Sequence, residues 1–298
     1  MTYTIAAFYR FTPVADVAAS VAVLKDELAA LGICGTILIA PEGINGTMAG
    51  SADAVAGLVA ILGSRFGMPA HEIKFSYAEE KPFKRLKVRP KKEIITFNQP
   101  AADPNKLVGA YVSAEAWNDL ISDPEVLVLD TRNTYETMIG TYEGAVVPPI
   151  EVFTEFADYV RKHLDPARNR KIAMFCTGGI RCEKASAFML AEGFPEVYHL
   201  KGGILKYLET VPEEQSKWQG ACYVFDRRMA VEHGLKPGDF DMCFSCGYAL
   251  KADDLTHPQY EAGVSCRHCY SNTNADQKAR FRMRHQQQAQ QAMRQDNA

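Results

Sequence analysis

The sequence lacks several features that would place a protein in a membrane or outside the cell. No hydrophobic run approaches the roughly 18 residues that a membrane-spanning helix needs. The first residues have neither the basic stretch nor the small-residue cleavage site of a secretory signal, so we expect none. The Gly-rich fingerprint of dinucleotide sites and the two-His-one-carboxylate iron triad are also missing. We therefore expect a cytoplasmic protein that has no membrane partner and no nucleotide cofactor.

Length and composition favour ordinary globular domains. The chain has 298 residues, of which 47% are hydrophobic and 23% charged, and these values exclude a globally disordered protein. Neither charge sign dominates, because 33 Lys and Arg oppose 36 Asp and Glu. A chain of this length typically forms two domains, or three small ones. Its eight cysteines, without a secretory signal, predict reactive thiols or metal ligands rather than structural disulfides.

The first 80 residues alternate between strand and helix patterns in the order βαββαβ. We expect strands at 3–9, 36–40, 47–49 and 73–77, and helices at 14–31 and 51–66. This order is typical of a ferredoxin-like α+β sandwich, in which four antiparallel strands pack under two helices. The sequence therefore predicts a ferredoxin-like N-terminal domain over residues 1–80.

A basic linker is predicted at residues 81–110, with a further strand at 93–97. Seven cations and no acidic residue occur between positions 81 and 92: Lys81, Lys84, Arg85, Lys87, Arg89, Lys91 and Lys92. Such cations can bind RNA phosphates, and Phe83 between them could stack on an unpaired base. The alternative is a solvated linker, which is the usual fate of a charged run.

Residues 111–217 show the strand and helix spacing of a parallel α/β domain. We expect strands at 126–130, 171–175 and 197–200, and helices at 113–120, 151–164, 181–192 and 203–208. Continuous apolar strands indicate burial on both faces, and such sheets bind ligands at the carboxyl ends of their strands. A cysteine-rich segment at 218–275 and a Gln- and Arg-rich tail at 276–298 follow; the tail is expected to be a mobile helix or disordered.

The most distinctive motif follows the strand at 171–175. Cys176 precedes a curl that contains two glycines, and a helix is predicted to begin near Arg181. The backbone N–H groups of such a curl, the helix N-terminus and the charge of Arg181 would all stabilise a Cys176 thiolate. The backbone of this active loop is expected to come from Thr177, Gly178, Gly179 and Ile180. The alternative is a buried free cysteine before a glycine turn.

Three further residues are candidates for roles at this loop. Asp130 and Arg132 lie at the end of the strand at 126–130, and we expect them to orient the loop rather than to act as acid or base. Cys182 lies six residues after Cys176 and could form a disulfide with an oxidised Cys176. It could equally be a small apolar residue on the inner face of the helix.

Two close cysteine pairs near the C-terminus have the spacing of a metal site. Nineteen residues separate the pairs, which are Cys243 with Cys246 and Cys266 with Cys269. This spacing is typical of a structural zinc site, in which four thiolates surround the ion tetrahedrally. Bound zinc would supply folding energy to a segment rich in loops, but a closed site would not be catalytic. Four reduced thiols, or two disulfides formed in air, are the alternatives.

The region around Cys176 resembles the rhodanese family. Three segments resemble its signatures in the same order: 128–132 with Tyr135, Glu136, Gly144 and Ala145; the loop 176–181; and 197–204. The resemblance implies that Cys176 carries a persulfide. Four residues separate Cys176 from Arg181, and this loop is shorter than that of the cysteine phosphatases, which disfavours phosphatase activity.

A closer resemblance, over about residues 3–270, is to the rhodanese-fold tRNA uridine hydroxylases. The motifs are 40–47, 84–89, 176–184, 223–226 with Arg228, and the two cysteine pairs. This resemblance implies oxygen-dependent hydroxylation at C5 of the wobble uridine in tRNA anticodons. It makes tRNA the partner, molecular oxygen a co-substrate and Cys176 the essential reactive group.

Two other functions would use the same residues. A sulfurtransferase would pass sulfur from a persulfide on Cys176, but it would need neither the βαββαβ unit nor the clustered cations. A non-catalytic RNA-binding module would leave the Cys176 loop without a chemical role.

Overall fold

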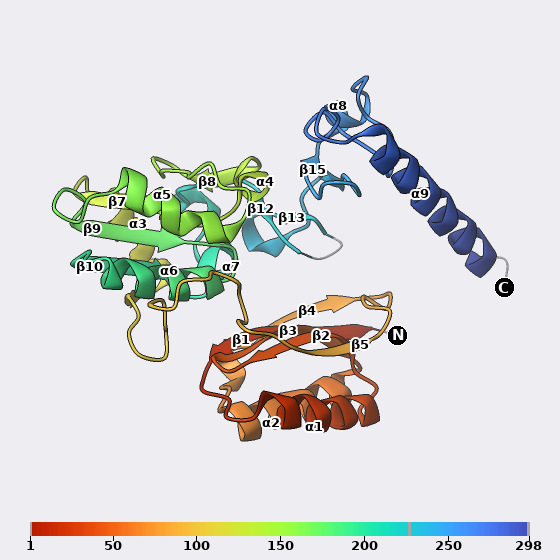
Figure 1. The fold of residues 1–298 in the computed structure, drawn as a ribbon, viewed down its shortest axis with the longest axis horizontal. Coiled ribbons are helices and arrows are strands. Elements are labelled where there is room, and N and C mark those ends of the chain that lie inside the picture. The colour runs from red at the N-terminus through yellow and green to blue at the C-terminus, as the bar shows by residue number, and fades with distance from the viewer. Residues whose placement is uncertain (1, 226–227, 297–298) are drawn as a thin grey trace.

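The computed structural model describes residues 2–225 and 228–296, with side chains described as far as residue 290. Figure 1 shows an α+β domain at the N-terminus, a central α/β domain, and a C-terminal extension that ends in a long helix. The N-terminal sheet is mixed, whereas the central sheet is parallel. The expected fold class is therefore confirmed.

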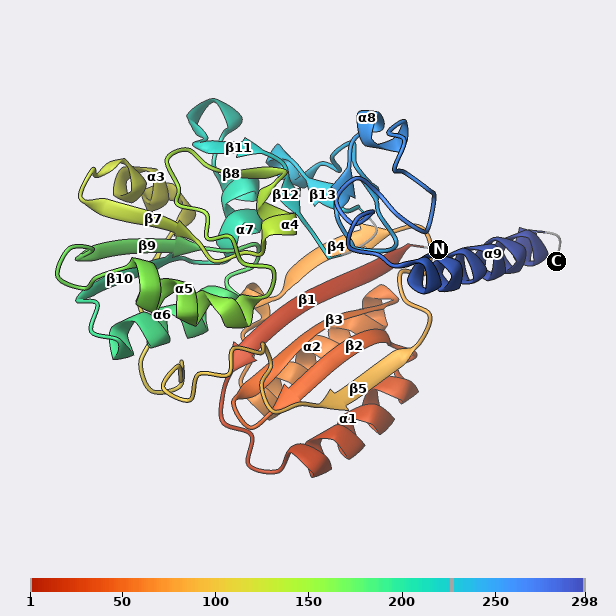
Figure 2. The same cartoon turned by 45° about the horizontal axis from the view of Figure 1, so that its top comes forward.

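The N-terminal domain is a sheet with two helices on one face (Figure 2). Its first elements are β1 (Tyr3–Phe11), α1 (Val17–Ala30), β2 (Cys34–Ala40), β3 (Gly43–Gly50), α2 (Ala52–Phe66) and β4 (Lys74–Ala78). These strands lie in the order β4-β1-β3-β2, and their neighbours are antiparallel, as expected for a ferredoxin-like domain. Asp16 and Ser51 cap the two helices, because each side chain accepts an N–H of the first turn.

The basic stretch differs from the expected linker, because part of it is a strand. β5 (Leu86–Pro90) pairs in parallel with β2 and becomes the fifth strand of the N-terminal sheet. Leu86 and Val88 pack against the core of this domain, which explains why the segment joins the sheet. Since side chains alternate along a strand, Lys87 and Arg89 point to the opposite face, which the helices leave open.

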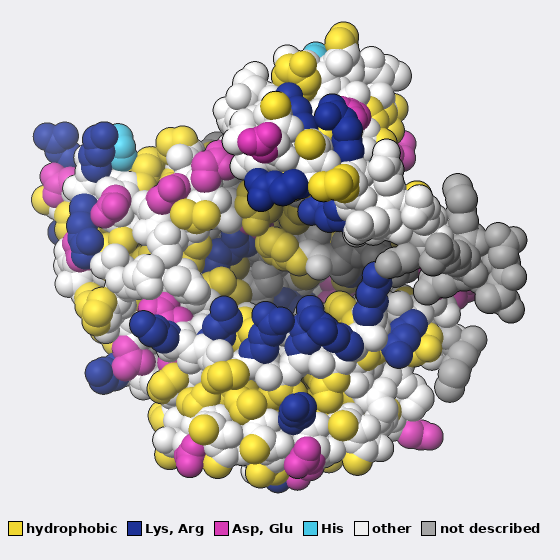
Figure 3. All heavy atoms as spheres, turned by 45° about the vertical axis from the view of Figure 1, so that its right-hand side comes forward, with side chains coloured by type: hydrophobic (Ala, Val, Ile, Leu, Met, Phe, Trp, Pro, Cys, Tyr) yellow, Lys and Arg dark blue, Asp and Glu magenta, His cyan; other side chains and the backbone are white. Residues whose placement is uncertain are grey.

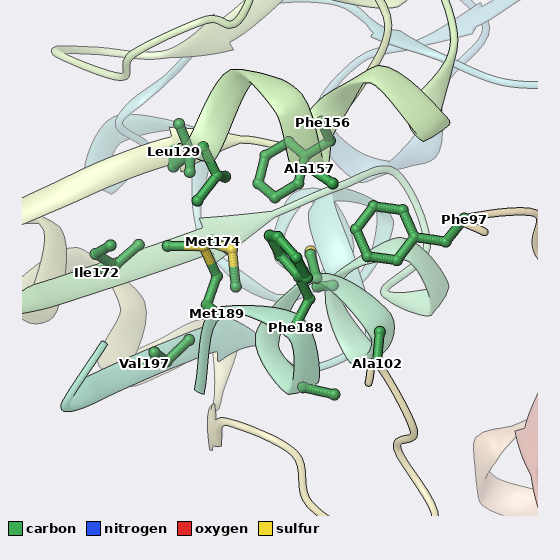
Figure 4. Packing of buried hydrophobic residues seen from close by; sticks show 14 of the residues in the cluster. Phe97, Ala102, Leu129, Phe156, Ala157, Ile172, Met174, Phe188, Met189 and Val197 are labelled. Atoms are coloured by element: carbon green, nitrogen blue, oxygen red, sulfur yellow. The ribbon is translucent and has the colours of Figure 1, made fainter. Parts of the chain in front are cut away.

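The segment after β5 packs into the central domain and does not form the strand expected at 93–97. Glu93 accepts the backbone N–H of Phe97, which turns the chain at this point. Phe97 is fully buried, and its ring stacks on Phe153 with the ring centroids 4.5 Å apart. Figure 4 shows the Phe97 ring pointing toward Phe188 among the buried residues of the central domain. This packing fixes the N-terminal domain to the central one.

The central domain is a four-stranded parallel sheet between two layers of helices. Its strands are β6 (Ala110–Val112), β7 (Val126–Asp130), β9 (Lys171–Phe175) and β10 (Glu196–Leu200), in the order β6-β10-β9-β7. Its helices are α3 (Ala114–Ser122), α4 (Thr134–Thr137), α5 (Phe156–His163), α6 (Ile180–Ala191) and α7 (Gly203–Thr210). One hydrophobic cluster lies on each side of the sheet, so both faces are buried as the apolar strands predict. The helix expected at 151–164 begins instead as a 3-10 turn at Phe153–Glu155.

Short two-stranded sheets and one long helix form the C-terminal part. β8 (Gly140–Tyr142) pairs with β11 (Trp218–Gly220), β12 (Cys222–Tyr223) with β13 (Ala230–Val231), and β14 (Asp241–Met242) with β15 (Ala249–Leu250). The helices here are α8 (Ala252–Leu255) and α9 (Ala275–Asp296). The tail is therefore helical over its described residues. Within residues 2–225 and 228–296, no helix is both long and apolar enough to cross a membrane.

The open face of the N-terminal sheet lies toward the central domain (Figures 1 and 2). Lys184 of α6 forms ion pairs with Glu42 and Glu93, at 2.8 and 2.9 Å. Tyr9 of β1 donates its hydroxyl hydrogen to Glu183, the neighbour of Lys184 in the first turns of α6. These contacts bring the N-terminal sheet against the carboxyl end of β9, where the sequence predicts the reactive loop.

Candidate active site

Cys176 lies at the point where β9 ends and α6 begins, in the expected loop. Its sulfur accepts the backbone N–H of Gly179 at 3.1 Å. Gly179 has a φ of 103°, and a Cβ atom there would lie 2.7 Å from the Tyr9 hydroxyl oxygen, so only glycine fits. At the start of α7, the N–H groups of Ile204 and Leu205 bind the carbonyl oxygens of residues 176 and 177. The loop backbone is therefore held from both sides.

The surroundings of the Cys176 sulfur favour its thiolate form. Burial opposes the charged form, but a hydrogen bond from the Cys182 thiol, the charge of Arg181 and the N–H groups of Cys182 and Gly179 outweigh it. Together they lower the pKa of Cys176 to about 5. The side chain has 0% exposed surface. A substrate can therefore reach this sulfur only after the residues that cover it move.

Arg181 does not stand alone beside the sulfur, because Glu136 binds it. Two guanidinium nitrogens of Arg181 lie 2.5 and 2.7 Å from the two carboxylate oxygens of Glu136. Glu136 also accepts the hydroxyl of Thr177 and the backbone N–H of Asn133. Burial opposes its ionised form, but the charge and hydrogen bonds of Arg181 keep the pKa of Glu136 low. The charge of Arg181 is thus largely balanced, and the pair fixes the loop from behind.

Asp130 and Arg132 form a second buried ion pair. The guanidinium of Arg132 lies 2.7 Å from the Asp130 carboxylate, and neither side chain has exposed surface. The Arg132 guanidinium also lies over the rings of Trp218 and Phe175, 5.1 and 6.0 Å from their centroids. Phe175 directly precedes Cys176. This geometry suits the expected orienting role, acting through the end of β9.

Cys182 faces the interior of the site. Its side chain is buried and lies 3.6 Å from the hydroxyl of Thr131, which in turn donates to the Phe175 carbonyl. Burial and the neighbouring Cys176 raise the pKa of Cys182 well above its usual range, so it stays a thiol that can donate to Cys176. Both expectations for Cys182, a disulfide partner and a small core residue, are compatible with this position.

Residues of the N-terminal domain also contact the loop. Lys74 donates to the carbonyl oxygens of Gly178 and Gly202, at 3.0 and 2.6 Å. Glu183 accepts the hydroxyl of Tyr9 at 3.2 Å and that of Tyr111 at 2.6 Å. Burial raises the pKa of Glu183 to about 7. The loop therefore lies between two domains rather than within one.

The four C-terminal cysteines gather as their spacing predicts. All four sulfur atoms lie within 4.8 Å of one another. Two of the distances are 3.7 Å, between Cys246 and Cys266, and 3.9 Å, between Cys243 and Cys269. Sulfurs at about 2.3 Å from one tetrahedral zinc ion would lie ~3.8 Å apart. The cluster therefore has a size that a metal ion fits, and its thiols are free rather than paired in disulfides.

The basic stretch lines one side of a hollow on the surface. Six of its seven cations are exposed, and Lys87 is half-buried. A space of about 460 Å³ is lined by Gly35, Thr36, Pro82, Phe83, Lys84, Arg85 and Lys87. Figure 3 shows Lys and Arg side chains in a row over the N-terminal domain, beside a hollow that faces the C-terminal part. The face is therefore positively charged although the chain as a whole is not.

Comparisons with known proteins match both folded domains. Residues 3–94 match the UPF0176 acylphosphatase-like domain, and residues 113–210 match the rhodanese-like domain. A tRNA uridine(34) hydroxylase of Deinococcus radiodurans is 56% identical over 286 residues, which cover 95% of this chain and 93% of that protein. The chain belongs to the tRNA uridine(34) hydroxylase family. This membership confirms the expected family and the expected class of enzyme, an oxidoreductase.

Two solved structures are similar to part of this chain. The rhodanese-like domain of an Anabaena protein is 22% identical with a TM-score of 0.31, and the match covers 38% of this chain and 80% of that domain. A rhodanese-related protein of Thermoplasma volcanium is 22% identical with a TM-score of 0.27, and the match covers 35% of this chain and 95% of that one.

Several residues that shape the active site of this hydroxylase family member cannot be recognised from the sequence alone. The sequence identifies Glu136 only as part of a rhodanese signature. No sequence pattern predicts its ion pair with Arg181. Lys74 and Tyr9 lie in no motif, and their contacts join positions 104 and 174 residues apart. Only the folded chain reveals such partners. Of the family motif 223–226, Asp226 lies outside the described residues.

Proposed function

We propose that this chain hydroxylates C5 of uridine 34 in tRNA, with Cys176 as the reactive group, molecular oxygen as co-substrate and a two-electron donor that reduces the second oxygen atom to water. Family membership supports the reaction and the substrate. The observation that carries the proposal is the Cys176 sulfur held by a backbone N–H at the start of a helix, with its pKa lowered to about 5. The thiolate is the nucleophilic form of cysteine, so the residue would be active at neutral pH.

The N-terminal sheet offers a path for RNA toward this sulfur. Directly paired residues of neighbouring strands share a face, and one such row runs from Lys87 through Thr36, Thr47 and Ala7 to Lys74. Four strand spacings make this row about 19 Å long. Phosphates bound near Lys87 and Arg89 would thus lie on the face whose other end touches the Cys176 loop.

The uridine must leave its stack to present C5 to a buried sulfur. An anticodon loop is single-stranded, so extruding one base from it costs little. Tyr9 and Lys74, which contact α6 and the loop, belong to the N-terminal domain, which also carries the basic stretch. We therefore propose that binding of tRNA to Lys81, Lys84, Arg85, Lys87, Arg89, Lys91 and Lys92 and opening of the loop act together.

The cysteine cluster suits a structural rather than a catalytic role. We propose that Cys243, Cys246, Cys266 and Cys269 hold one Zn²⁺, which would stabilise the C-terminal extension. Four thiolates would close the coordination sphere and leave no open position for a substrate. Reduced thiols at all eight cysteines also fit the cytoplasm, where we expect the protein to act.

A sulfurtransferase is the second candidate, because the match to the rhodanese-like domain and the loop geometry suit a persulfide on Cys176. The open basic sheet face argues against it, since small sulfur acceptors need no such surface. The organised loop argues against a non-catalytic RNA-binding module, since binding alone needs no N–H group directed at a sulfur.

Nucleoside analysis of bulk tRNA separates these candidates. A strain without the gene should lack 5-hydroxyuridine-type modification, the wild-type gene should restore it, and Cys176→Ala should not. Unchanged modification in the deletion strain would favour the sulfurtransferase. Restoration by Cys176→Ala would remove the cysteine from the reaction. Cys34→Ala, which alters a buried cysteine of the N-terminal domain, is the matched control and should restore the modification.

A further inference from the structure

The Cys176 loop is completed by Lys74, a residue of another domain. Lys74 begins β4 in the N-terminal sheet, and its ammonium binds the carbonyl oxygens of Gly178 and Gly202. Gly178 belongs to the loop, and Gly202 belongs to the turn that precedes α7. One side chain therefore ties together the two glycine turns that shape the site.

The bond from Lys74 to Gly178 acts on the peptide group that holds the sulfur. The carbonyl of Gly178 and the N–H of Gly179 belong to one trans peptide, so they point in opposite directions. Lys74 binds this group at its oxygen, while the N–H on the other side lies 3.1 Å from the Cys176 sulfur. A charged donor on the oxygen fixes the direction of the N–H and also polarises it, because hydrogen bonds in a chain strengthen one another.

Lys74 also differs from Arg181 in its charge balance. Glu136 neutralises Arg181, whereas both partners given for the Lys74 ammonium within the described residues are neutral carbonyl oxygens. Burial lowers the pKa of Lys74 to about 8, and the charge on Cys176 opposes this effect. At neutral pH the ammonium therefore remains largely protonated close to the thiolate.

We propose that Lys74 is a positioning residue of the active site: it directs the Gly178–Gly179 peptide toward the Cys176 sulfur and adds an unbalanced positive charge beside it. Since it acts through a Cys176 thiolate, the inference rests on the proposed function. This role gives the N-terminal domain a contact with the active loop, in addition to the RNA binding proposed for its basic stretch.

The test compares Lys74→Met, Lys74→Gln and Lys74→Arg with Lys25→Met, which alters an exposed lysine on α1. Mass spectrometry follows iodoacetamide alkylation of Cys176 against pH, and steady-state hydroxylation of tRNA gives kcat and KM. Both uncharged variants should raise the pH midpoint of alkylation by roughly one unit or more. Their kcat should fall at least tenfold while KM for tRNA changes less than threefold, and Lys74→Arg should recover part of both losses.

The outcomes separate this inference from the proposed function. A wild-type midpoint near that of a free cysteine, about 8.5, would overturn both, because no thiolate would then exist at neutral pH. A low wild-type midpoint that Lys74→Met and Lys74→Gln leave unchanged would overturn only the role of Lys74. A lower melting temperature without a shifted midpoint would show a merely structural role and also overturn it. If Lys74→Met does not fold, the Lys74→Gln and Lys74→Arg midpoints decide.

Discussion

Arg181 and Glu136 form a buried, two-pronged ion pair directly behind the Cys176 loop. Glu136 also accepts the hydroxyl of Thr177, so one carboxylate links the second residue of the loop to its last. The positive charge of Arg181, which the sequence assigns to the thiolate, therefore also interacts with a carboxylate. Among the influences that lower the pKa of Cys176, the hydrogen bond from the Cys182 thiol is the largest, and the charge of Arg181 and the backbone N–H groups follow it.

Replacing Glu136 should destabilise the whole central domain. In Glu136→Gln the Arg181 guanidinium stays buried without its counter-charge, so the free energy of unfolding should fall by about 3–5 kcal/mol. Urea denaturation at pH 7 measures this change. The double variant Glu136→Gln/Arg181→Met removes both charges and should regain part of the loss. Glu214→Gln, at an exposed site, should change stability by less than ~0.5 kcal/mol. Equal stability of the Glu136 and Glu214 variants would contradict the importance of the pair.

The reactivity of Cys176 should depend on pH as that of a strongly acidic thiol. Its pKa is lowered to about 5, so the thiolate is present above pH 5 and is lost as the pH falls through that value. Alkylation should therefore be nearly constant from pH 6.5 to 8.5, where an ordinary thiol increases its rate many-fold. Because the sulfur is buried, the absolute rate should rise when tRNA opens the site.

Cys182 should account for part of this acidity. Cys182→Ala removes the thiol that donates to Cys176, and the midpoint of Cys176 alkylation should move upward by roughly one pH unit. Cys34→Ala should leave the midpoint unchanged. If Cys182→Ala also leaves it unchanged, Cys182 is only a core residue. Peptide mapping after mild peroxide treatment would show whether Cys176 and Cys182 join in a disulfide.

The fold was largely predictable because it depends on local patterns. Ser51 and Ser113 begin helices where their spacing to apolar residues indicates, and the continuous apolar strand 171–175 is buried on both faces. The errors arose where tertiary contacts decide. Leu86 and Val88 alternate with cations, so the sequence of this segment resembles a linker. It forms a strand because it pairs with the edge of β2 and because Leu86 and Val88 pack against the N-terminal core.

The site was predictable only in its centre. Cys176 and its glycines lie in one continuous motif, and the four distant cysteines share a recognisable spacing. Lys74 has no such neighbours in the sequence, because its partners are Gly178 and Gly202 in another domain. Nothing in the sequence distinguishes Glu136 from other acidic residues that follow a strand. Its ion pair with Arg181 is visible only in the folded structure.

The basic stretch should control how tRNA binding depends on salt. A triple variant, Lys84→Ala, Arg85→Ala and Arg89→Ala, should weaken binding and make the slope of log K against log salt shallower by about 2, since each single-stranded phosphate contact contributes about 0.7. Filter binding or fluorescence anisotropy from 50 to 300 mM salt measures the slope. The control removes three exposed cations elsewhere: Lys25, Lys162 and Arg168. Identical slopes for both triple variants would exclude the stretch from the RNA interface.

The four-cysteine cluster should contain one zinc ion per chain when the protein is purified under reducing conditions. The 3.7 and 3.9 Å separations between sulfurs match the ~3.8 Å expected around one tetrahedral ion. Elemental mass spectrometry gives the content, and Cys243→Ser or Cys269→Ser should lose the ion. Because bound metal contributes folding energy, the same variants should lower the melting temperature of the C-terminal extension, as should a strong chelator. Cys34→Ala should keep its zinc. A folded, active preparation without metal, whose four thiols all react with a thiol reagent, would rule out a structural zinc site and leave the cluster as reduced cysteines.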